Sequence, residues 1–233
     1  MRSYTRRQLK QDQFAAATRD TVSWAVEHRN KLIYGGIVLT VVLAIGLGSW
    51  FYTRRQNEVA GKALAQALQT YQAPLNATAQ AGQTSFANAA ERAKAARAQF
   101  AKIADAHPRT RSGQMARYFE GLSDEVLGNT AAAEKELKQA AASGPQDVTS
   151  LAKLALANLY RGTGRDGQAE RLYKELMDHP TNTVATSAAQ LALADLYESK
   201  KPQEARRIYE ELRKQDPQGA AGQMAASRLG SIK

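Results

Sequence analysis

Cysteine is absent from this 233-residue sequence, which excludes disulfide bridges, thiol chemistry and cysteine metal sites. Histidine is scarce, and the three histidines lie far apart in the sequence, so they do not indicate a metal site. No nucleophile stands beside a general base in a pattern typical of covalent catalysis. We therefore expect a non-enzyme that uses no cofactor and no metal.

A concentrated basic surface is also lacking, although the formal net charge is +10. Residues 1–31 carry seven basic and three acidic side chains, whereas residues 56–233 carry 23 basic and 19 acidic ones. Acidic residues such as Glu134, Glu136, Glu210 and Glu211 alternate with lysine and arginine, which predicts solvated helix faces. Nucleic-acid binding needs basic side chains gathered on one face. The sequence therefore favours no nucleic-acid partner.

Charge is missing altogether from residues 32–52, a 21-residue apolar run with basic residues on both sides. A helix of this length covers the roughly 30 Å hydrocarbon core of a bilayer. Aromatic residues, which are enriched at membrane interfaces, stand at both ends of the run: Tyr34, Trp50, Phe51 and Tyr52. The run predicts a single transmembrane helix in contact with the lipid bilayer.

A cleavable signal peptide is the alternative interpretation of the same run, since Gly46 and Gly48 resemble a weak cleavage site. A signal peptide has a shorter apolar core, and small residues lead from it to the cleavage site. Here bulky aromatic residues and two arginines follow instead. A spanning helix is therefore the preferred interpretation.

Basic residues predict the orientation of this helix. Residues 1–31 hold seven of them, and the ten residues after the run hold three. The flank richer in lysine and arginine stays in the cytoplasm. We therefore expect a single-pass protein of the inner (cytoplasmic) membrane, with its N-terminus in the cytoplasm and residues 53–233 in the periplasm.

Four segments are expected along the chain. The leader is predicted to be helical over residues 5–29, where it lies on the inner leaflet, docks a cytosolic partner or simply remains solvated. A second helix is predicted over residues 56–80, with Pro74 straining its end. The expected domains are a basic cytoplasmic leader helix (1–31), the transmembrane helix (32–52), a connecting helix and loop (53–85) and a repeat domain with a C-terminal capping helix (86–233).

Small residues recur every four positions within the apolar run: Gly36, Thr40, Ala44 and Gly48. Such a row lies on one helix face and lets two membrane helices approach closely. The row predicts a helix–helix contact in the membrane and hence a homo-oligomer. Glycine is also common in membrane helices that make no such contact, so both interpretations stay open.

A repeat follows the apolar run. Four alanines stand 37, 36 and 36 residues apart, each is followed four positions later by a large apolar residue, and a proline comes after each pair. Residues i and i+4 share a helix face, and a proline past the last turn ends a helix. The alanines are Ala96, Ala133, Ala169 and Ala205, the large residues are Phe100, Leu137, Tyr173 and Tyr209, and the prolines are Pro108, Pro145, Pro180 and Pro217.

The helices before these segments carry a partner pattern, namely Leu156, Ala157 and Tyr160, then Leu193, Ala194 and Tyr197. Together the two patterns resemble the tetratricopeptide repeat, a 34-residue helix–turn–helix motif. The resemblance covers residues 111–217 and, as the second helix of a degenerate earlier repeat, residues 86–110. It implies an all-α chain, in which the single transmembrane helix is followed by a tetratricopeptide-like α-solenoid of helix–turn–helix repeats.

The sequence departs from that motif in three places. The tryptophan of the motif is missing, with Lys153 and Gln190 in its place, and Asp124 stands where a tyrosine belongs. A closing helix is expected over residues 218–230, with Met224 and Leu229 covering the last apolar face.

Residues 162–167 satisfy the pattern G-x-G-x-x-G. A dinucleotide site requires this pattern between a strand and a helix. A predicted helix precedes it here, so we interpret residues 162–167 as the turn of a hairpin rather than a cofactor site.

The basic leader, the single span and the exported repeat domain together resemble the membrane-anchored family that includes the ancillary subunit of the bacterial Sec translocon. The resemblance is one of layout and repeat class, and it implies partners that are exported or envelope proteins, with translocon subunits among them. It suggests a membrane-anchored protein-interaction scaffold. A structural self-assembling membrane protein and a regulatory subunit of an envelope complex are the alternatives.

Repeats of this kind stack into a curved array whose concave face is built from first helices. By the family's pattern the protein-binding groove takes two residues from each of three repeats: Tyr118, Leu122, Leu154, Asn158, Leu191 and Asp195. Some of these residues are alternatively expected to pack between repeats. The mixture suits a segment of another protein, because aromatic and aliphatic anchors supply most of the energy of such contacts.

Overall fold

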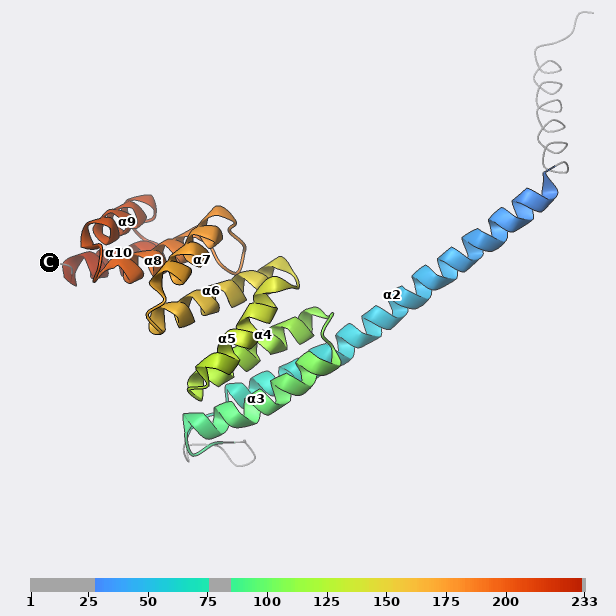
Figure 1. Ribbon diagram of the computed structural model, residues 1–233, viewed down its shortest axis with the longest axis horizontal. Coiled ribbons are helices and arrows are strands. Elements are labelled where there is room, and N and C mark those ends of the chain that lie inside the picture. The colour runs from blue at the N-terminus through green and yellow to red at the C-terminus, as the bar shows by residue number, and fades with distance from the viewer. Residues whose placement is uncertain (1–27, 76–84, 232–233) are drawn as a thin grey trace, which may run out of the picture. The chain divides into compact units, whose positions relative to one another are not determined.

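The computed structural model describes residues 28–75 and 85–231, so most of the predicted leader helix lies outside the described residues. All regular secondary-structure elements within these two ranges are α-helices (Figure 1). The all-α prediction is therefore confirmed for this part of the chain. The chain divides into two compact units, Met1–Arg54 and Arg55–Lys233, which we describe separately.

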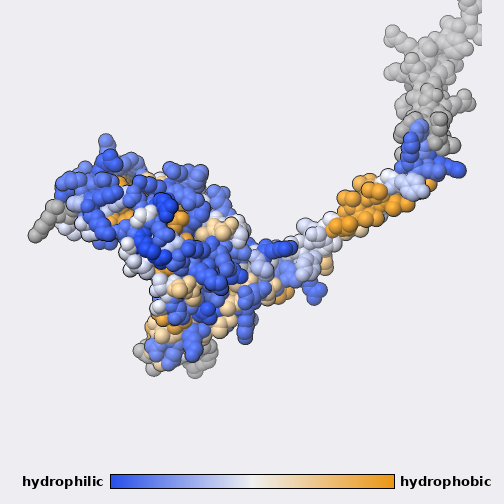
Figure 2. Space-filling view, in the orientation of Figure 1, coloured by the Kyte–Doolittle hydropathy of each residue, from blue (hydrophilic) through white to orange (hydrophobic). Residues whose placement is uncertain are grey.

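Helix α2 (Arg29–Tyr71) contains the whole apolar run. Among the described residues it is the one helix long and apolar enough to cross a membrane, and none of its apolar window is buried against protein. Figure 2 shows apolar side chains gathered on this helix, whereas the visible surface of the repeat unit is mostly hydrophilic. By length and composition, α2 is thus a candidate membrane span.

The unit Arg55–Lys233 is built from helices that follow one another as hairpins. Consecutive helices from α3 onward contact each other, and so do the first helices of successive hairpins, α4 with α6 and α6 with α8. Helix α8 also contacts the last helix, α10. Each hairpin therefore packs on its neighbours, as in a solenoid. The helices are α3 (Ala89–Ala106), α4 (Arg111–Val126), α5 (Thr130–Ala142), α6 (Gln146–Gly162), α7 (Asp166–Asp178), α8 (Thr186–Tyr197), α9 (Pro202–Gln215) and α10 (Ala220–Ser231).

The core confirms the repeat register predicted from the alanines. In each second helix the alanine and the large residue four positions later are both 0% exposed, as in the pairs Ala96 and Phe100 of α3 and Ala169 and Tyr173 of α7. Helices α3, α5, α7 and α9 each end two or three residues before the expected proline. The spacing of small, large and proline residues therefore sets both the buried face and the end of each second helix.

The first hairpin begins earlier than the sequence suggested. The last turns of α2 pack against α3 and α4 in one cluster, in which Tyr71, Phe100 and Phe119 meet as an aromatic group. The ring centroids of Phe100 and Phe119 lie 5.3 Å apart in a stacked arrangement. The segment expected to be a connecting helix is thus the first helix of the first hairpin, and the compact unit starts at Arg55 rather than at residue 86.

The end of α2 also differs from the prediction. The helix stops at Tyr71 and does not continue to residue 80. Pro74 lacks a backbone N–H and pushes the residue before it out of the helical region, so the helix ends before this proline.

Helix α10 closes the array at the position expected for a capping helix. Its inward face consists of Gly222 and Ala225, which are buried, and Leu229, which packs partly on the core. Met224 was expected on that face but is 52% exposed. Gly222, Ala225 and Leu229 are three and four residues apart and share one side of the helix, which turns Met224 away from the core.

Candidate protein-binding surface

The six predicted groove residues come from the first helices of three successive hairpins. The four apolar ones, Tyr118, Leu122, Leu154 and Leu191, are partly buried and pack against the main core cluster. Leu154 also packs against a smaller cluster around Leu176, Val184 and Ala189. The apolar members of the row present only part of their surface, because they also contribute to packing between repeats, and their role in binding stays a prediction.

The two polar residues of the row hold second helices in place. The Tyr173 hydroxyl donates a hydrogen bond to Asn158 Oδ1 at 2.7 Å, and the Tyr209 hydroxyl donates to Asp195 Oδ1 at 2.5 Å. Burial raises the pKa of Tyr173 to about 12 and raises the pKa of Tyr209 well above its ordinary value. Both hydroxyls therefore stay protonated and act as donors to the first helix of their own hairpin.

Ion pairs occupy the downstream end of the row. Asp195 of α8 lies 3.7 Å from Arg161 of α6 and 3.6 Å from Arg228 of α10. Arg228 also lies 3.8 Å from Glu198. Charges of both signs are thus satisfied within the chain at this end, so the upstream part of the row offers the more open apolar surface.

Polar pairs occupy two of the positions at which the motif has tryptophan, namely Lys153 and, four residues before Gly121 in the preceding repeat, Arg117. Lys153 Nζ lies 2.6 Å from Glu175 Oε1, and Arg117 Nη1 donates to Gln139 Oε1 at 2.7 Å. Both pairs join residues that are 22 positions apart, one in the first helix and one in the second helix of a hairpin. The sequence showed that the tryptophan is absent. It also held the signal that predicts these pairs, because a basic residue is followed 22 positions later by an acid or an amide in both hairpins.

A small hollow accompanies the pair in the third hairpin. It has a volume of about 260 Å³ and lies between α6 and α7, beside Lys153, Glu175 and His179. A tryptophan ring would have been large enough to fill much of such a space, whereas the lysine chain bridges it and leaves part of it open.

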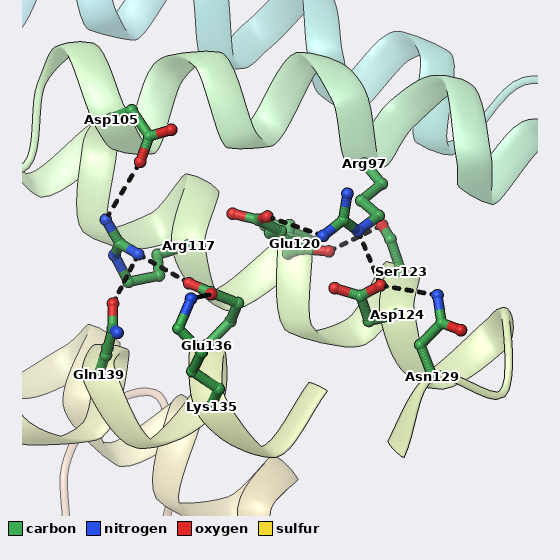
Figure 3. A network of polar contacts seen from close by, with 11 residues as sticks. Arg97, Asp105, Arg117, Glu120, Ser123, Asp124, Asn129, Lys135, Glu136 and Gln139 are labelled. Carbon is green, nitrogen blue, oxygen red and sulfur yellow. Dashed lines mark hydrogen bonds and ion pairs between the residues drawn. The ribbon is translucent and has the colours of Figure 1, made fainter. Parts of the chain in front are cut away.

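The aspartate that stands in place of a tyrosine belongs to a buried ionic cluster between α3, α4 and α5 (Figure 3). Asp124 is 0% exposed, and Arg97 Nε donates to its Oδ1 at 2.7 Å. Glu136 is 5% exposed and accepts from Arg117 Nη1 at 2.7 Å. The prediction that Glu136 lies on a solvated face is therefore wrong. Helical periodicity alone did not show that α5 turns this carboxylate toward Arg117 of α4.

A wide hollow of about 900 Å³ with a mixed polar and apolar lining lies between the last turns of α2 and helix α3. Gln66, Gln69, Gln72, Gln99 and Lys102 contribute to its lining. Gln99 donates a hydrogen bond to Thr70 Oγ1 at 3.0 Å across it. An outer face rich in amides is typical of a terminal repeat, which needs a polar surface where no further repeat covers it.

The glycine-rich segment forms a turn, as predicted. Gly164 lies between α6 and α7 with a φ of +73°, and Gly128 has the equivalent place between α4 and α5 with a φ of +74°. Glycine adopts this left-handed conformation without a steric penalty. No strand precedes the segment in the described part of the chain, so the context of a dinucleotide site is not met there.

The row of small residues predicted to contact a second span lies on α2. Thr40, Ala44 and Gly48 are exposed, and a Cβ added at Gly48 would meet no atom within 4 Å. The surroundings of Gly36 lie outside the described residues. The contact with a second span stays a prediction.

These features define the class of the repeat unit as an α-solenoid of helical hairpins. The model of one family, described as a tetratricopeptide repeat-like domain, matches residues 22–172, and the chain belongs to this family. The matched region includes the apolar run and the hairpins as far as α7. No curated protein and no solved structure matches the chain.

Proposed function

We propose that this protein is a membrane-anchored scaffold whose repeat unit binds other proteins at the membrane surface. Membership of the tetratricopeptide repeat-like family supports the scaffold role, because repeats of this type present extended surfaces for protein binding rather than catalytic sites. Membership of the family does not imply a membrane anchor or particular partners. The anchor is supported by the apolar window of α2, and the partners are suggested by the layout of the chain.

One observation is the main support for a membrane anchor. The apolar window of α2 is exposed over its whole length, although the same helix goes on to supply Leu68 and Tyr71 to the first hairpin. An exposed apolar surface of this size is not stable in water, whereas a lipid bilayer covers it. The family match begins at residue 22 and runs through the apolar window, which favours a permanent part of the protein over a leader that is removed.

The excess of basic residues before the apolar run supports a cytoplasmic N-terminus, and with it a repeat unit in the periplasm of a bacterial inner membrane. Exported and envelope proteins would then be its partners. The layout resembles that of the ancillary subunit of the Sec translocon, and on this resemblance alone we extend the proposal to a site beside the translocon. Tethering to a membrane raises the effective concentration of a domain, so contacts of modest affinity suffice.

The binding face we propose is the row formed by Tyr118, Leu122 and Leu154, together with Leu191 further along. These side chains are partly exposed, and apolar anchors of this type supply most of the energy of a protein interface. The row contains no run of lysine and arginine, so it does not fit a phosphate backbone.

The test is affinity purification of the full-length protein from detergent-solubilised membranes, comparing two double variants. The first, Leu154→Ser with Leu191→Ser, changes the proposed face. The second, Leu172→Ser with Ile208→Ser, changes partly buried apolar residues that pack on the same core cluster but belong to second helices.

Because both variants lose similar packing, only the first should lose the partners recovered with the unchanged protein. Equal recovery with both variants would show that binding lies elsewhere. Recovery of nothing but further copies of the same chain would favour the alternative of a self-assembling membrane protein.

A further inference from the structure

A cluster of charged side chains with buried carboxylates lies where α3, α4 and α5 meet (Figure 3). Three carboxylates belong to it, and the side chains of Glu120, Asp124 and Glu136 are exposed to 8%, 0% and 7%. Two guanidinium groups, of Arg97 and Arg117, pair with them. The cluster therefore holds one more carboxylate than guanidinium groups, and the remaining base, Lys135, is 68% exposed.

The contacts of the three carboxylates are unequal, and one oxygen of Asp124, Oδ2, is buried without a hydrogen-bond partner. Asp124 accepts hydrogen bonds from Arg97 at 2.7 Å and from Asn129 at 3.1 Å. Glu136 accepts from Arg117 at 2.7 Å and from Lys135 at 2.8 Å. Glu120 has only a longer contact of 3.4 Å to Arg97, whose better hydrogen bond already goes to Asp124. In Figure 3, Glu120 lies between the other two pairs.

Glu120 faces ionisable groups from each of the three helices that form the cluster. They are Arg97 from α3, Glu136 and Lys135 from α5, and Arg117 and Asp124 from α4 itself. Burial and the nearby charge of Glu136 raise the pKa of Glu120 to about 7 from an ordinary value of 4.5, against the opposite effect of Arg97. A buried charge is costly when its one ion pair is long and is shared with a second carboxylate, so the protonated form is the one that fits this position.

We propose that the joint between the first and second hairpins is a pH-sensitive element, which Glu120 holds closed when protonated and loosens when ionised. By joint we mean the contact between the first hairpin, formed by α2 and α3, and the second hairpin, formed by α4 and α5. Its opening therefore changes how firmly the first hairpin is held to the rest of the array. This proposal concerns the fold of the chain, so it stands whether or not the scaffold role is correct.

Hydrogen exchange of the full-length protein in detergent micelles, at pH 6 and pH 8, tests the proposal. Protection factors are corrected for the intrinsic pH dependence of exchange. If opening exposes Glu120 to water, linkage between a closed-state pKa of about 7 and an open-state value of 4.5 lowers the protection of α3 and α4 by about tenfold between these pH values. Amides of α9 and α10 serve as the internal reference and should not change in this way.

Two variants separate this role from a general effect of charge. Glu120→Gln should give the same protection at pH 8 as at pH 6. Glu175→Gln, which changes a surface pair with Lys153 outside the cluster, should keep the tenfold difference. The proposal is overturned if the unchanged protein shows no difference between the two pH values, or if Glu120→Gln keeps it.

A measurement without any variant completes the test. The side-chain carboxyl carbon of Glu120, followed by carbon-13 NMR in the unchanged protein, should titrate with a midpoint near pH 7. A midpoint near the ordinary value of 4.5 would overturn the proposal even if Glu120→Gln failed to fold.

Discussion

Tyr173 donates a 2.7 Å hydrogen bond to Asn158 and so joins the two helices of one hairpin through the polar residue of the predicted groove. The next hairpin repeats this arrangement with Tyr209 and Asp195. A residue that looks like part of a binding surface in the sequence thus also stabilises the fold. Variants of Asn158 and Asp195 therefore have to be tested for stability before any loss of binding is assigned to the groove.

Replacing Asn158 by alanine should destabilise the protein by about 1–3 kcal/mol, because the buried hydroxyl of Tyr173 loses its acceptor. Thermal unfolding of the full-length protein in detergent measures the change. In the background of Tyr173→Phe, which removes the hydroxyl, the same substitution should cost much less. Equal costs in the two backgrounds would mean that the hydrogen bond contributes nothing.

The repeat register can be tested within a single helix. Ala96 is 0% exposed and faces the core, whereas Ala98 of the same helix is exposed. Ala96→Leu should overpack the contact between the helices and cost about 1–3 kcal/mol. Ala98→Leu makes the same chemical change on the outer face and should stay within about 0.5 kcal/mol. Thermal melts that rank the two variants the other way would contradict the register.

The sequence predicted the second helices well because their pattern is local. An alanine, a large residue four positions on and a proline after the last turn determine one buried face and one helix end, as in Ala169, Tyr173 and Pro180. The first hairpin was harder, since the turns of α2 that pack on α3 carry alanine, leucine and glutamine without the repeat's own signature. A continuous helix also hid the boundary between the apolar run and the repeat unit.

The ionic cluster between α3, α4 and α5 could not be predicted from helical periodicity. Asp124 and Glu136 pair with arginines that lie 27 and 19 positions away, and only the packing of three helices brings these groups together. For the groove, the sequence placed the residues in the correct first helices. It did not predict that Asn158 and Asp195 accept hydrogen bonds from the tyrosines of the second helices.

Gly121 of α4 lies where this helix closely approaches α5. A Cβ at this position would lie 2.7 Å from Cγ of Leu137, a separation that forces the leucine to move. Gly121→Ala should therefore cost about 1–3 kcal/mol in thermal unfolding, even though alanine favours helices. Adding Leu137→Ala in the same chain removes the clashing Cγ and Cδ2 atoms, so the clash part of the cost should fall. Strict additivity of the two single costs would argue against the contact.

Acid should weaken the hairpin of α4 and α5 through Glu136. Burial raises the pKa of this carboxyl, but hydrogen bonds from Lys135 and Arg117 outweigh that effect and lower it below the ordinary 4.5. A lowered pKa gives stability that is present above pH 4.5 and is lost as the pH falls through the folded-state value. Thermal melts between pH 7 and pH 3 should show this loss.

The control for this loss of stability in acid is Glu136→Gln, which keeps the shape of the side chain but cannot titrate. It should lower stability at pH 7 and flatten the loss below pH 4.5. A variant that loses stability in acid as steeply as the unchanged protein would show that other carboxylates cause the acid effect.

The orientation of α2 is the last prediction, and it depends on seven basic residues before the apolar run against three in the ten residues after it. A phosphatase that is active only in the periplasm, fused after Lys233, should be active in a bacterial host. A fluorescent protein that folds only in the cytoplasm should be dark at the same position and bright when fused before Met1. The opposite pattern at both ends would reverse the topology. Activity of the C-terminal phosphatase together with release of the protein from washed membranes would instead support a cleaved leader, since a protein that keeps α2 stays with the bilayer.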